Sequence, residues 1–322
     1  MTSFSQKVKK EILKAKRDSD ALFCMLCGEI LSAGSLLINN HEITFVLSSE
    51  SKEFLTAVEG QLFECFEVEK SSIKISKEQG SIKEKFELSI SPFFGRRVLE
   101  GLKILSRDEN GNTAISRSPE QYFLQDKGAK IAYLAGAFCG AGSISVPETG
   151  GKSTGGYHME WVCQTPERAQ VVCEILAEFD IISKKIERNG SSVAYIKESD
   201  AICQILALMG AVASMLELEN SKVEREVRNN INRQSNCMSA NLDKVMNASV
   251  KQMQAIDEIS RTVGIESLPE DLLEVALARV ANPEASLSEL VKILGNKISR
   301  VAVSQRLAKI IKLAQELGGE NG

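Results

Sequence analysis

Apolar residues in the first two thirds of the chain follow two spacings, one typical of strands and one typical of helices. Apolar and polar residues alternate in two runs, as in strands with one buried face: Ile43, Phe45 and Leu47 in the first, and Met159, Trp161 and Cys163 in the second. Helical spacing follows each run, in residues 55–62 and 172–179, and Thr165-Pro166 opens the second helix. Two strand candidates and a helix then close each half: 73–75, 86–90 and 94–105, and later 184–186, 193–196 and 201–208. The order α-β-β-α-β-β-α is therefore expected twice.

A ten-residue segment near the start of each half repeats in the sequence. Residues 26–35, LCGEILSAGS, align with residues 134–143, LAGAFCGAGS, at an offset of 108 residues. The strand-like runs lie 116 residues apart, and the Gly-rich segment 147–156 accounts for the difference as an enlarged hairpin loop. Gly28 and Gly136 would let two helices approach closely, so the two segments are expected to form the seam between the halves. The alternative is that these small residues are ordinary core positions and that the repeat arose by chance.

The C-terminal residues predict a group of helices with clear boundaries. Ser267 with Glu270, and Ser286 with Glu289, have capping-box spacing and predict two helix starts, with the helices reaching residues 280 and 294. Residues 295–297, Gly-Asn-Lys, predict a tight turn, and a longer helix follows over residues 299–317. Its apolar stripe consists of Val303, Leu307, Ile310 and Ala314. A short helix, a Gly-containing turn and a basic helix are typical of a helix-turn-helix.

Between the repeat and the C-terminal helices, residues 221–233 predict an exposed linking helix. Asn229, Asn230 and Asn232 favour a break or a polar contact there, because Asn is a weak helix former. The fold class is therefore α+β, a duplicated α-β-β-α-β-β-α domain followed by an all-α helix-turn-helix domain. The expected domains are 1–115 (N-terminal helix and first half), 116–215 (second half), 216–265 (helical linker) and 266–322 (helix-turn-helix domain).

Composition narrows the class of protein without identifying a partner. With 322 residues, of which 43% are apolar and 25% charged, the chain can bury a sizeable core. The least polar stretch, residues 202–216, is too short to span a bilayer, so no membrane segment is expected. Ser3 and Gln6 have capping-box spacing, and Phe4, Val8 and Ile12 share a face, so the N-terminus predicts a helix rather than a secretory signal.

The eight cysteines lie in apolar contexts, which indicates small core residues in a reducing cytoplasm. Cys24 and Cys27 form a CxxC, but the chain has no second CxxC and only two histidines. A zinc site would need two more ligands. A pair of cysteines buried on a helix is therefore favoured over a zinc site.

Charge becomes informative only when it is counted locally. The net charge is −4, yet residues 286–317 hold six Lys or Arg against two Glu, a local balance of +4. In a helix-turn-helix the first turns of the second helix enter the major groove, where Arg pairs with guanine and Gln with adenine. The expected DNA-binding residues are Lys297, Ser299, Arg300, Ala302, Val303, Ser304, Gln305, Arg306 and Lys309. The alternative is a helical bundle that docks onto the preceding domain.

The two repeated segments resemble the LAGLIDADG motif of homing endonucleases, in which paired helices place one acidic residue from each copy beside the scissile phosphates. Here the eighth motif position is Ala33 in one copy and Ala141 in the other, and the sixth is Leu31 and Cys139. Mg²⁺ needs hard oxygen ligands, which these side chains lack. Glu29, the single acid in either copy, is interpreted as part of a solvated helix face. We expect no nuclease activity, no catalytic residue, no metal and no cofactor, with Ala33 and Ala141 as vacant nuclease positions.

Such a domain could still bind DNA through its sheets. The lysines and arginine on the strand candidates are Lys74, Lys77, Lys83, Lys85, Lys184, Lys185, Arg188 and Lys197. They could meet phosphates. Glutamates lie among them, however, so solvated sheet edges are the favoured interpretation.

The chain as a whole resembles the bacterial WhiA family of sporulation and cell-division regulators. The matching segments are SFS at 3–5, VKKE at 8–11, YLAGAF at 133–138, LELEN at 216–220, RNNINR at 228–233, NC at 236–237, ANL at 240–242, SLPE at 267–270 and NPEASL at 282–287. The resemblance implies a LAGLIDADG-like domain without nuclease function, joined by a helical linker to a helix-turn-helix that recognises promoter DNA. It also implies roles in cell division and chromosome segregation, and in sporulation in sporulating relatives.

Two departures from the family pattern affect what can be carried over. Ala135 stands where the family usually has Arg, and residues 299–306, SRVAVSQR, differ from the usual S-K-S-G-V-N-H-R, although Arg306 is kept. The operator sequence therefore cannot be inferred from the resemblance.

The expected partners are double-stranded DNA at promoter regions and a protein of the transcription or division machinery. The expected location is the cytoplasm, in association with the nucleoid. Two alternatives stay open. One is a division or nucleoid-associated scaffold that acts mainly through protein contacts, and the other is an active endonuclease or RNA maturase.

Overall fold

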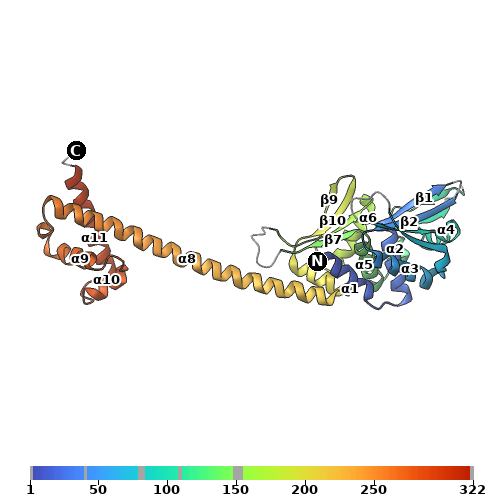
Figure 1. Ribbon diagram of the computed structural model, residues 1–322, viewed down its shortest axis with the longest axis horizontal. Helices are drawn as coiled ribbons and strands as arrows, with labels where there is room; N and C mark the ends of the chain where they lie inside the picture. The colour runs from blue at the N-terminus through green and yellow to red at the C-terminus, as the bar shows by residue number, and fades with distance from the viewer. Residues whose placement is uncertain (1–2, 40–41, 79–83, 108–110, 148–154, 320–322) are drawn as a thin grey trace. The chain divides into compact units, whose positions relative to one another are not determined.

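The two repeats fold into the same order of elements. The computed structural model describes residues 3–39, 42–78, 84–107, 111–147 and 155–319 (Figure 1). The first repeat consists of α2 (Ser19–Ala33), β1 (Gly34–Asn39), β2 (Glu42–Ser49), α3 (Lys52–Phe66), β3 (Ile73–Lys77), β4 (Phe86–Ile90) and α4 (Pro92–Gly101). The second consists of α5 (Lys127–Ala141), β7 (Gly142–Ser145), β8 (His158–Cys163), α6 (Pro166–Ala177), β9 (Lys184–Arg188), β10 (Ser191–Ile196) and α7 (Ser199–Leu208). The predicted order α-β-β-α-β-β-α is confirmed in both halves.

Each repeat builds one four-stranded antiparallel sheet with the same strand order. The first sheet runs β1-β2-β4-β3 and the second runs β7-β8-β10-β9. The alternating residues predicted to face the core are buried in both sheets, with Phe45 and Leu47 of β2 and Met159 and Trp161 of β8 at most 1% exposed. The predicted α+β class is therefore confirmed. Residues 148–154 of the predicted hairpin loop, and Lys83, lie outside the described residues.

Helices α2 and α5 pack directly against each other at the centre of the domain that the two repeats form (Figure 1). A methyl group added at Gly136 would lie 1.9 Å from the carbonyl oxygen of Met25, and one added at Gly28 would lie 2.3 Å from that of Tyr133. Such distances leave no space for a side chain. The two glycines therefore permit backbone-to-backbone packing, and the predicted seam between the halves is confirmed.

Several predicted boundaries need correction. The capping box of Ser3 and Gln6 does open α1 (Phe4–Lys14). Helix α4, however, ends at Gly101 and not near residue 105, because Lys103 adopts a left-handed conformation with φ of 55°. Leu105 instead starts β5 (Leu105–Arg107), which pairs with β6 (Thr113–Ile115) in a hairpin that the sequence pattern did not predict. Short 3-10 turns, η1 (Lys70–Ser72) and η2 (Gln121–Leu124), precede β3 and α5.

The prediction that Glu29 lies on a solvated helix face is wrong. Glu29 is 0% exposed on α2. Residues 24–31 of this helix are all buried, so it has no solvated face there, and its other residues in this stretch are apolar or glycine. The side-chain amide of Gln61 donates a hydrogen bond to Glu29 Oε1 at 3.3 Å, while Glu29 Oε2 and Gln61 Oε1 have no partner among the described residues. Burial raises the pKa of Glu29 to about 8. Both oxygens thus lack a donor, and a protonated carboxyl group has one, which favours the neutral form of Glu29 in this place.

The cysteine prediction holds for the CxxC but not for every cysteine. Cys24 and Cys27 are buried on α2, 4% and 1% exposed. Cys237 is exposed on the long helix α8 (Val212–Thr262) and is not a core residue. In the described part of the chain, no helix is long and apolar enough to cross a membrane.

The chain divides into two compact units, Met1–Arg225 and Glu226–Gly322. The second contains the C-terminal part of α8, then η3 (Ile265–Ser267), α9 (Glu270–Ala281), α10 (Leu287–Ile293) and α11 (Arg300–Gly319). Helix α8 runs unbroken through the three asparagines, so of the two alternatives predicted there, a break or a polar contact, the break is wrong. The predicted capping box at Ser267 is also wrong. Pro269 disfavours helical backbone at Leu268, so α9 begins only at Glu270, and the Ser267 hydroxyl donates to the carbonyl of Gly264 at 2.7 Å.

Substituting Gly136→Ala should test the seam between α2 and α5. Alanine favours a helix over glycine by about 1 kcal/mol, but the clash with the Met25 carbonyl cannot be relieved by a side-chain rotation. We expect a net loss of about 3 kcal/mol in the free energy of unfolding, measured by denaturant titration. Gly60→Ala is the matched control, because that glycine lies in α3 with no atom near its missing methyl. The control should be neutral or slightly stabilising, and equal losses in both variants would contradict the close packing.

Glu29→Gln should remove a pH dependence of stability. The pKa of Glu29 is raised in the folded state, so folding binds a proton between pH 4.5 and about 8, and stability falls as the pH rises through that window. Glutamine mimics the protonated acid. We therefore expect wild type and Glu29→Gln to differ little near pH 5, and the variant to be more stable by about 3 kcal/mol near pH 8.

The exposed Glu64 on α3 supplies the control for that experiment. Glu64→Gln should leave the difference between the two pH values unchanged. A variant at position 29 that is destabilised equally at both pH values would show that Glu29 is ionised in the folded protein.

Candidate nucleic-acid interface

The short helix α10 is held at its start by a complete capping box, as predicted. The backbone N–H of Glu289 donates to the Ser286 hydroxyl at 3.3 Å, and the backbone N–H of Ser286 donates to the Glu289 carboxylate at 2.7 Å. The hydrogen bond from the Ser286 backbone N–H to the Glu289 carboxylate is the main cause that lowers the pKa of Glu289, and the Ser286 side chain adds to it. Leu290, one turn further on, is completely buried. Local hydrogen bonds and one core contact therefore fix where α10 begins and which face it buries.

The turn after α10 depends on two residues in left-handed conformation. Gly295 has φ of 68° and Asn296 has φ of 56°, a conformation that glycine and asparagine adopt most readily. The N–H of Asn296 donates to the carbonyl of Val291 at 2.9 Å, and so satisfies a carbonyl at the end of α10. The predicted tight turn at residues 295–297 is confirmed, and it reverses the chain into α11.

Helix α11 begins with Ser299 as its cap and buries the predicted apolar stripe. The Ser299 hydroxyl accepts a hydrogen bond from the N–H of Ala302 at 3.2 Å. The four stripe residues are 7% exposed or less: Val303, Leu307, Ile310 and Ala314. They pack against residues of α8, α9 and α10 in one core cluster. The opposite side of α11 is therefore exposed within this unit.

The predicted DNA-binding residues do not all lie on the exposed side. Lys297, Ser299, Arg300, Ser304, Gln305 and Lys309 are exposed, and Ala302 and Arg306 are partly buried. Val303 must be removed from the set, because it is 0% exposed in the core and cannot reach a ligand. Val301, which the prediction left out, is 65% exposed beside Arg300. Its helical phase could have identified it, because it falls opposite the apolar stripe.

Some of the cationic side chains around α11 form ion pairs with carboxylates, and others do not. Arg306 Nε lies 3.5 Å from the Asp271 carboxylate of α9, and Lys312 lies 3.8 Å from Glu316 one turn away. Lys292, Lys297, Arg300 and Lys309 form no ion pair with any described residue. The cations available to an anionic partner therefore extend from the end of α10 through the turn into the first half of α11.

Arg279 of α9 stabilises the start of α10, a role that was not predicted from the sequence. Its side chain is 2% exposed, and one guanidinium nitrogen donates to the carbonyl of Ala285 at 2.6 Å, just before the Ser286 cap. Arg279 follows Leu272, Val275 and Ala276 at helical spacing, so its place on the buried face of α9 could have been predicted from the sequence. Desolvation lowers its pKa. This arginine is a structural residue that holds the α9–α10 connection, and it is not free to bind DNA.

The motif positions Ala33 and Ala141 are the last residues of α2 and α5. A methyl added at Gly140, next to Ala141, would lie 3.3 Å from Cβ of Ala33, so the two helix ends are neighbours. Neither end offers a carboxylate at the eighth position of its motif. Within the described residues, no three His, Cys, Asp or Glu side chains are grouped so that they could hold a metal ion.

The duplicated sheet-and-helix unit and the helical unit together define a protein with a LAGLIDADG-like domain followed by a helix-turn-helix domain. Two family descriptions match the chain, the WhiA LAGLIDADG-like domain over residues 130–228 and the WhiA C-terminal HTH domain over residues 231–314. The chain is 34% identical over 322 residues to a probable cell division protein WhiA of Clostridium acetobutylicum, covering 99% of each chain. It is 33% identical over 318 residues to the protein of the same name in Clostridium beijerinckii, covering 98% of each. The chain belongs to the WhiA family, and the resemblance predicted from sequence is confirmed.

The crystal structure of full-length DUF199/WhiA from Thermatoga maritima has the same fold. It aligns with 96% of this chain and 97% of its own length, with a TM-score of 0.53 and 24% sequence identity.

Proposed function

We propose that this protein is a sequence-specific DNA-binding transcriptional regulator that acts at promoters through its helix-turn-helix. The proposed contact residues are Lys297, Ser299, Arg300, Val301, Ala302, Ser304, Gln305, Arg306 and Lys309. The observation that carries the proposal is the exposed, cationic first half of α11, which follows the capped helix α10 and its left-handed turn. This is the part of a helix-turn-helix that enters the major groove.

The exposed side chains of α11 and the preceding turn could make different kinds of contact in the major groove of DNA. Lys297 and Ser299 lie before the first turn of α11, where phosphate contacts set the register of the helix. Arg300 and Gln305 can each make paired hydrogen bonds, to guanine and adenine respectively. Val301 offers an apolar surface for a thymine methyl group. The proposed site therefore combines contacts to the DNA phosphates, which position the helix, with contacts that distinguish the bases.

The proposed cellular role is regulation linked to cell division and chromosome segregation, and to sporulation in sporulating relatives. The name of the two clostridial relatives, probable cell division protein, supports the first of these. The proposed location is the cytoplasm, in association with the nucleoid.

Chromatin profiling separates the regulator from a division scaffold, because a regulator gives peaks at promoters and a scaffold gives diffuse or absent signal.

Arg300→Ala should weaken binding to a duplex selected in vitro by the wild-type protein. We expect about a tenfold loss of affinity, because one cation is lost from the interface. The slope of the logarithm of affinity against the logarithm of salt concentration should also become smaller by about one. Fluorescence anisotropy over a salt series measures both quantities. Arg261→Ala is the control, since Arg261 is exposed in the same unit but pairs with Asp257 on α8, at 2.8 Å. An unchanged affinity in Arg300→Ala, or an equal loss in both variants, would remove α11 from the proposal.

We also propose that the LAGLIDADG-like domain does not cleave DNA. Ala33 and Ala141 cannot ligate a cation, and Glu29, the remaining acid of the motif segments, is completely buried. Purified protein incubated with duplex DNA and Mg²⁺ or Mn²⁺ should leave the DNA intact. Metal-dependent cleavage that disappears when residues of the two motif segments are replaced would contradict this, whereas cleavage unaffected by such changes indicates a contaminating nuclease.

A further inference from the structure

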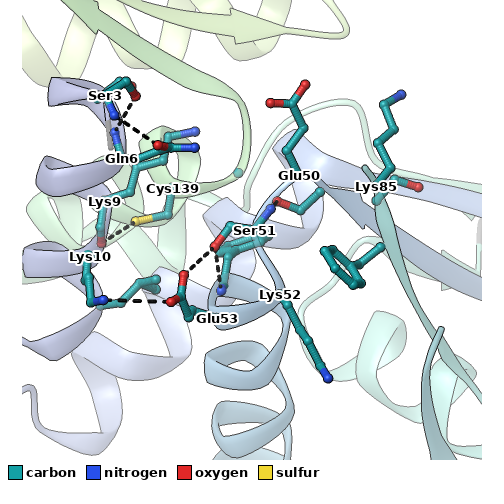
Figure 2. Close-up of a pocket in the computed structure, with 17 residues that line it drawn as sticks. Ser3, Gln6, Lys9, Lys10, Glu50, Ser51, Lys52, Glu53, Lys85 and Cys139 are labelled. Carbon is teal, nitrogen blue, oxygen red and sulfur yellow. Dashed lines mark hydrogen bonds and ion pairs between the residues drawn. The ribbon is translucent and has the colours of Figure 1, made fainter. Parts of the chain in front are cut away.

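A lysine-lined cavity of about 710 Å³ opens in the first unit, where α1, the end of β2, the start of α3 and the start of β4 meet the end of α5 (Figure 2). Its described lining includes Lys9, Lys10, Lys52 and Lys85 against Glu50 and Glu53, an excess of two positive charges. Serine hydroxyls from α1, β2 and α3 line it as well. Helices α1 and α3 both begin at this cavity, so the positive ends of two helix dipoles add to the lysines.

The lysines of this cavity are only partly neutralised by protein groups. Lys10 lies 3.7 Å from the Glu53 carboxylate, and Figure 2 shows this pair joining α1 to α3. Lys9 has no hydrogen-bonded or ion-paired partner for its ammonium among the described residues, and its charge lies 5.8 Å from the centre of the Phe138 ring. Burial is the main cause that lowers the pKa of Lys9. A partly desolvated cation is costly, the nearby charge of Glu50 offsets part of that cost, and a bound anion would offset more of it.

The internal duplication offers a comparison, because a smaller cavity of about 380 Å³ lies at the corresponding place in the second repeat, with Leu31, Gln164 and Arg168 in its lining. The second repeat places Arg168, in the first turn of α6, at the corresponding position beside α2. Its guanidinium donates to the carbonyl of Leu31 at 2.6 Å, to that of Arg117 at 2.9 Å and to the side-chain oxygen of Gln164 at 3.0 Å, so this cation already has three protein oxygens as partners. The first repeat has the apolar Phe54 in the first turn of α3 instead, and α1 adds Lys9 from outside the repeat.

The shape and lining identify the class of ligand. A volume of about 710 Å³ lies in the range of pockets for small organic ligands. Leu13 and Phe86, both partly exposed, supply an apolar wall, while the lysines and serines supply donors for an anion. We infer that this cavity binds a nucleotide, with its phosphates at Lys9, Lys85 and the serine hydroxyls and its base against the apolar wall. The inference is independent of DNA binding by α11, because all of the lining residues belong to the first unit.

Calorimetric titration of the full chain with each of the four ribonucleoside triphosphates, and with inorganic phosphate, tests the site. At least one nucleotide should bind with one-to-one stoichiometry and a Kd on the order of 10 to 100 μM, and more tightly than phosphate. Lys9→Met and Lys85→Met should each weaken binding about tenfold, since each removes a cation but keeps the length of the side chain. Lys74→Met is the control, because Lys74 is exposed on β3 and does not line the cavity, and it should bind as wild type does.

A second measurement on the wild-type chain does not depend on how the variants fold. The bound nucleotide should protect Lys9 and Lys85 from acetylation, read by mass spectrometry, and leave Lys74 reactive. The inference is wrong if no nucleotide binds, if Lys74→Met weakens binding as much as the cavity variants, or if only duplex DNA protects the two lysines. The last result would assign the lysines to a DNA surface.

Discussion

The architecture of the first unit depends on the distance between the backbones of α2 and α5. Gly28 and Gly136 face the other helix directly, and neither position has room for a single methyl group. Both four-stranded sheets start from the ends of these helices, since β1 follows α2 without a break and β7 follows α5 in the same way. The helix contact therefore sets the spacing of the two sheets. A change at the seam would move every element attached to it.

The same packing explains why an acid within the seam behaves so differently from an acid on a surface helix. Glu29 lies one residue after Gly28, and its own N–H would be 3.1 Å from a methyl at Gly136. Water cannot reach it, and Gln61 is its hydrogen-bonding partner among the described residues. A carboxyl group in such a place is most stable when it carries a proton. The acid that remains in the motif is thus a structural hydrogen-bonding group, and its chemistry is unlike that of an exposed metal ligand.

The sequence predicted the fold well wherever a local pattern determines the structure. The repeat, the alternating strands and the capping boxes at Ser3 and Ser286 are local patterns, and the structure confirms them. The failures about burial have a common cause, which is that burial depends on distant residues, whereas the capping box at Ser267 failed for the local reason that Pro269 moves the start of α9. Glu29 looked solvated because nothing near it in sequence reveals that α3 and α5 cover it. Val303 was placed in the core stripe and also in the DNA-binding set, and only its zero exposure decides between the two.

The helical unit shows why a count of charges overstates what a DNA-binding surface offers. Residues 286–317 hold six cations, but Arg306 and Lys312 lie beside carboxylates, and Arg279 nearby is buried against backbone carbonyls. A cation that already has an oxygen partner gains less from a phosphate, because the first contact must be broken or shared. Affinity from counterion release follows the number of phosphates that are newly neutralised. That number is set mainly by the four cations that form no ion pair in the described part of the unit: Lys292, Lys297, Arg300 and Lys309. The cationic surface is therefore smaller than the count of six in the sequence indicates.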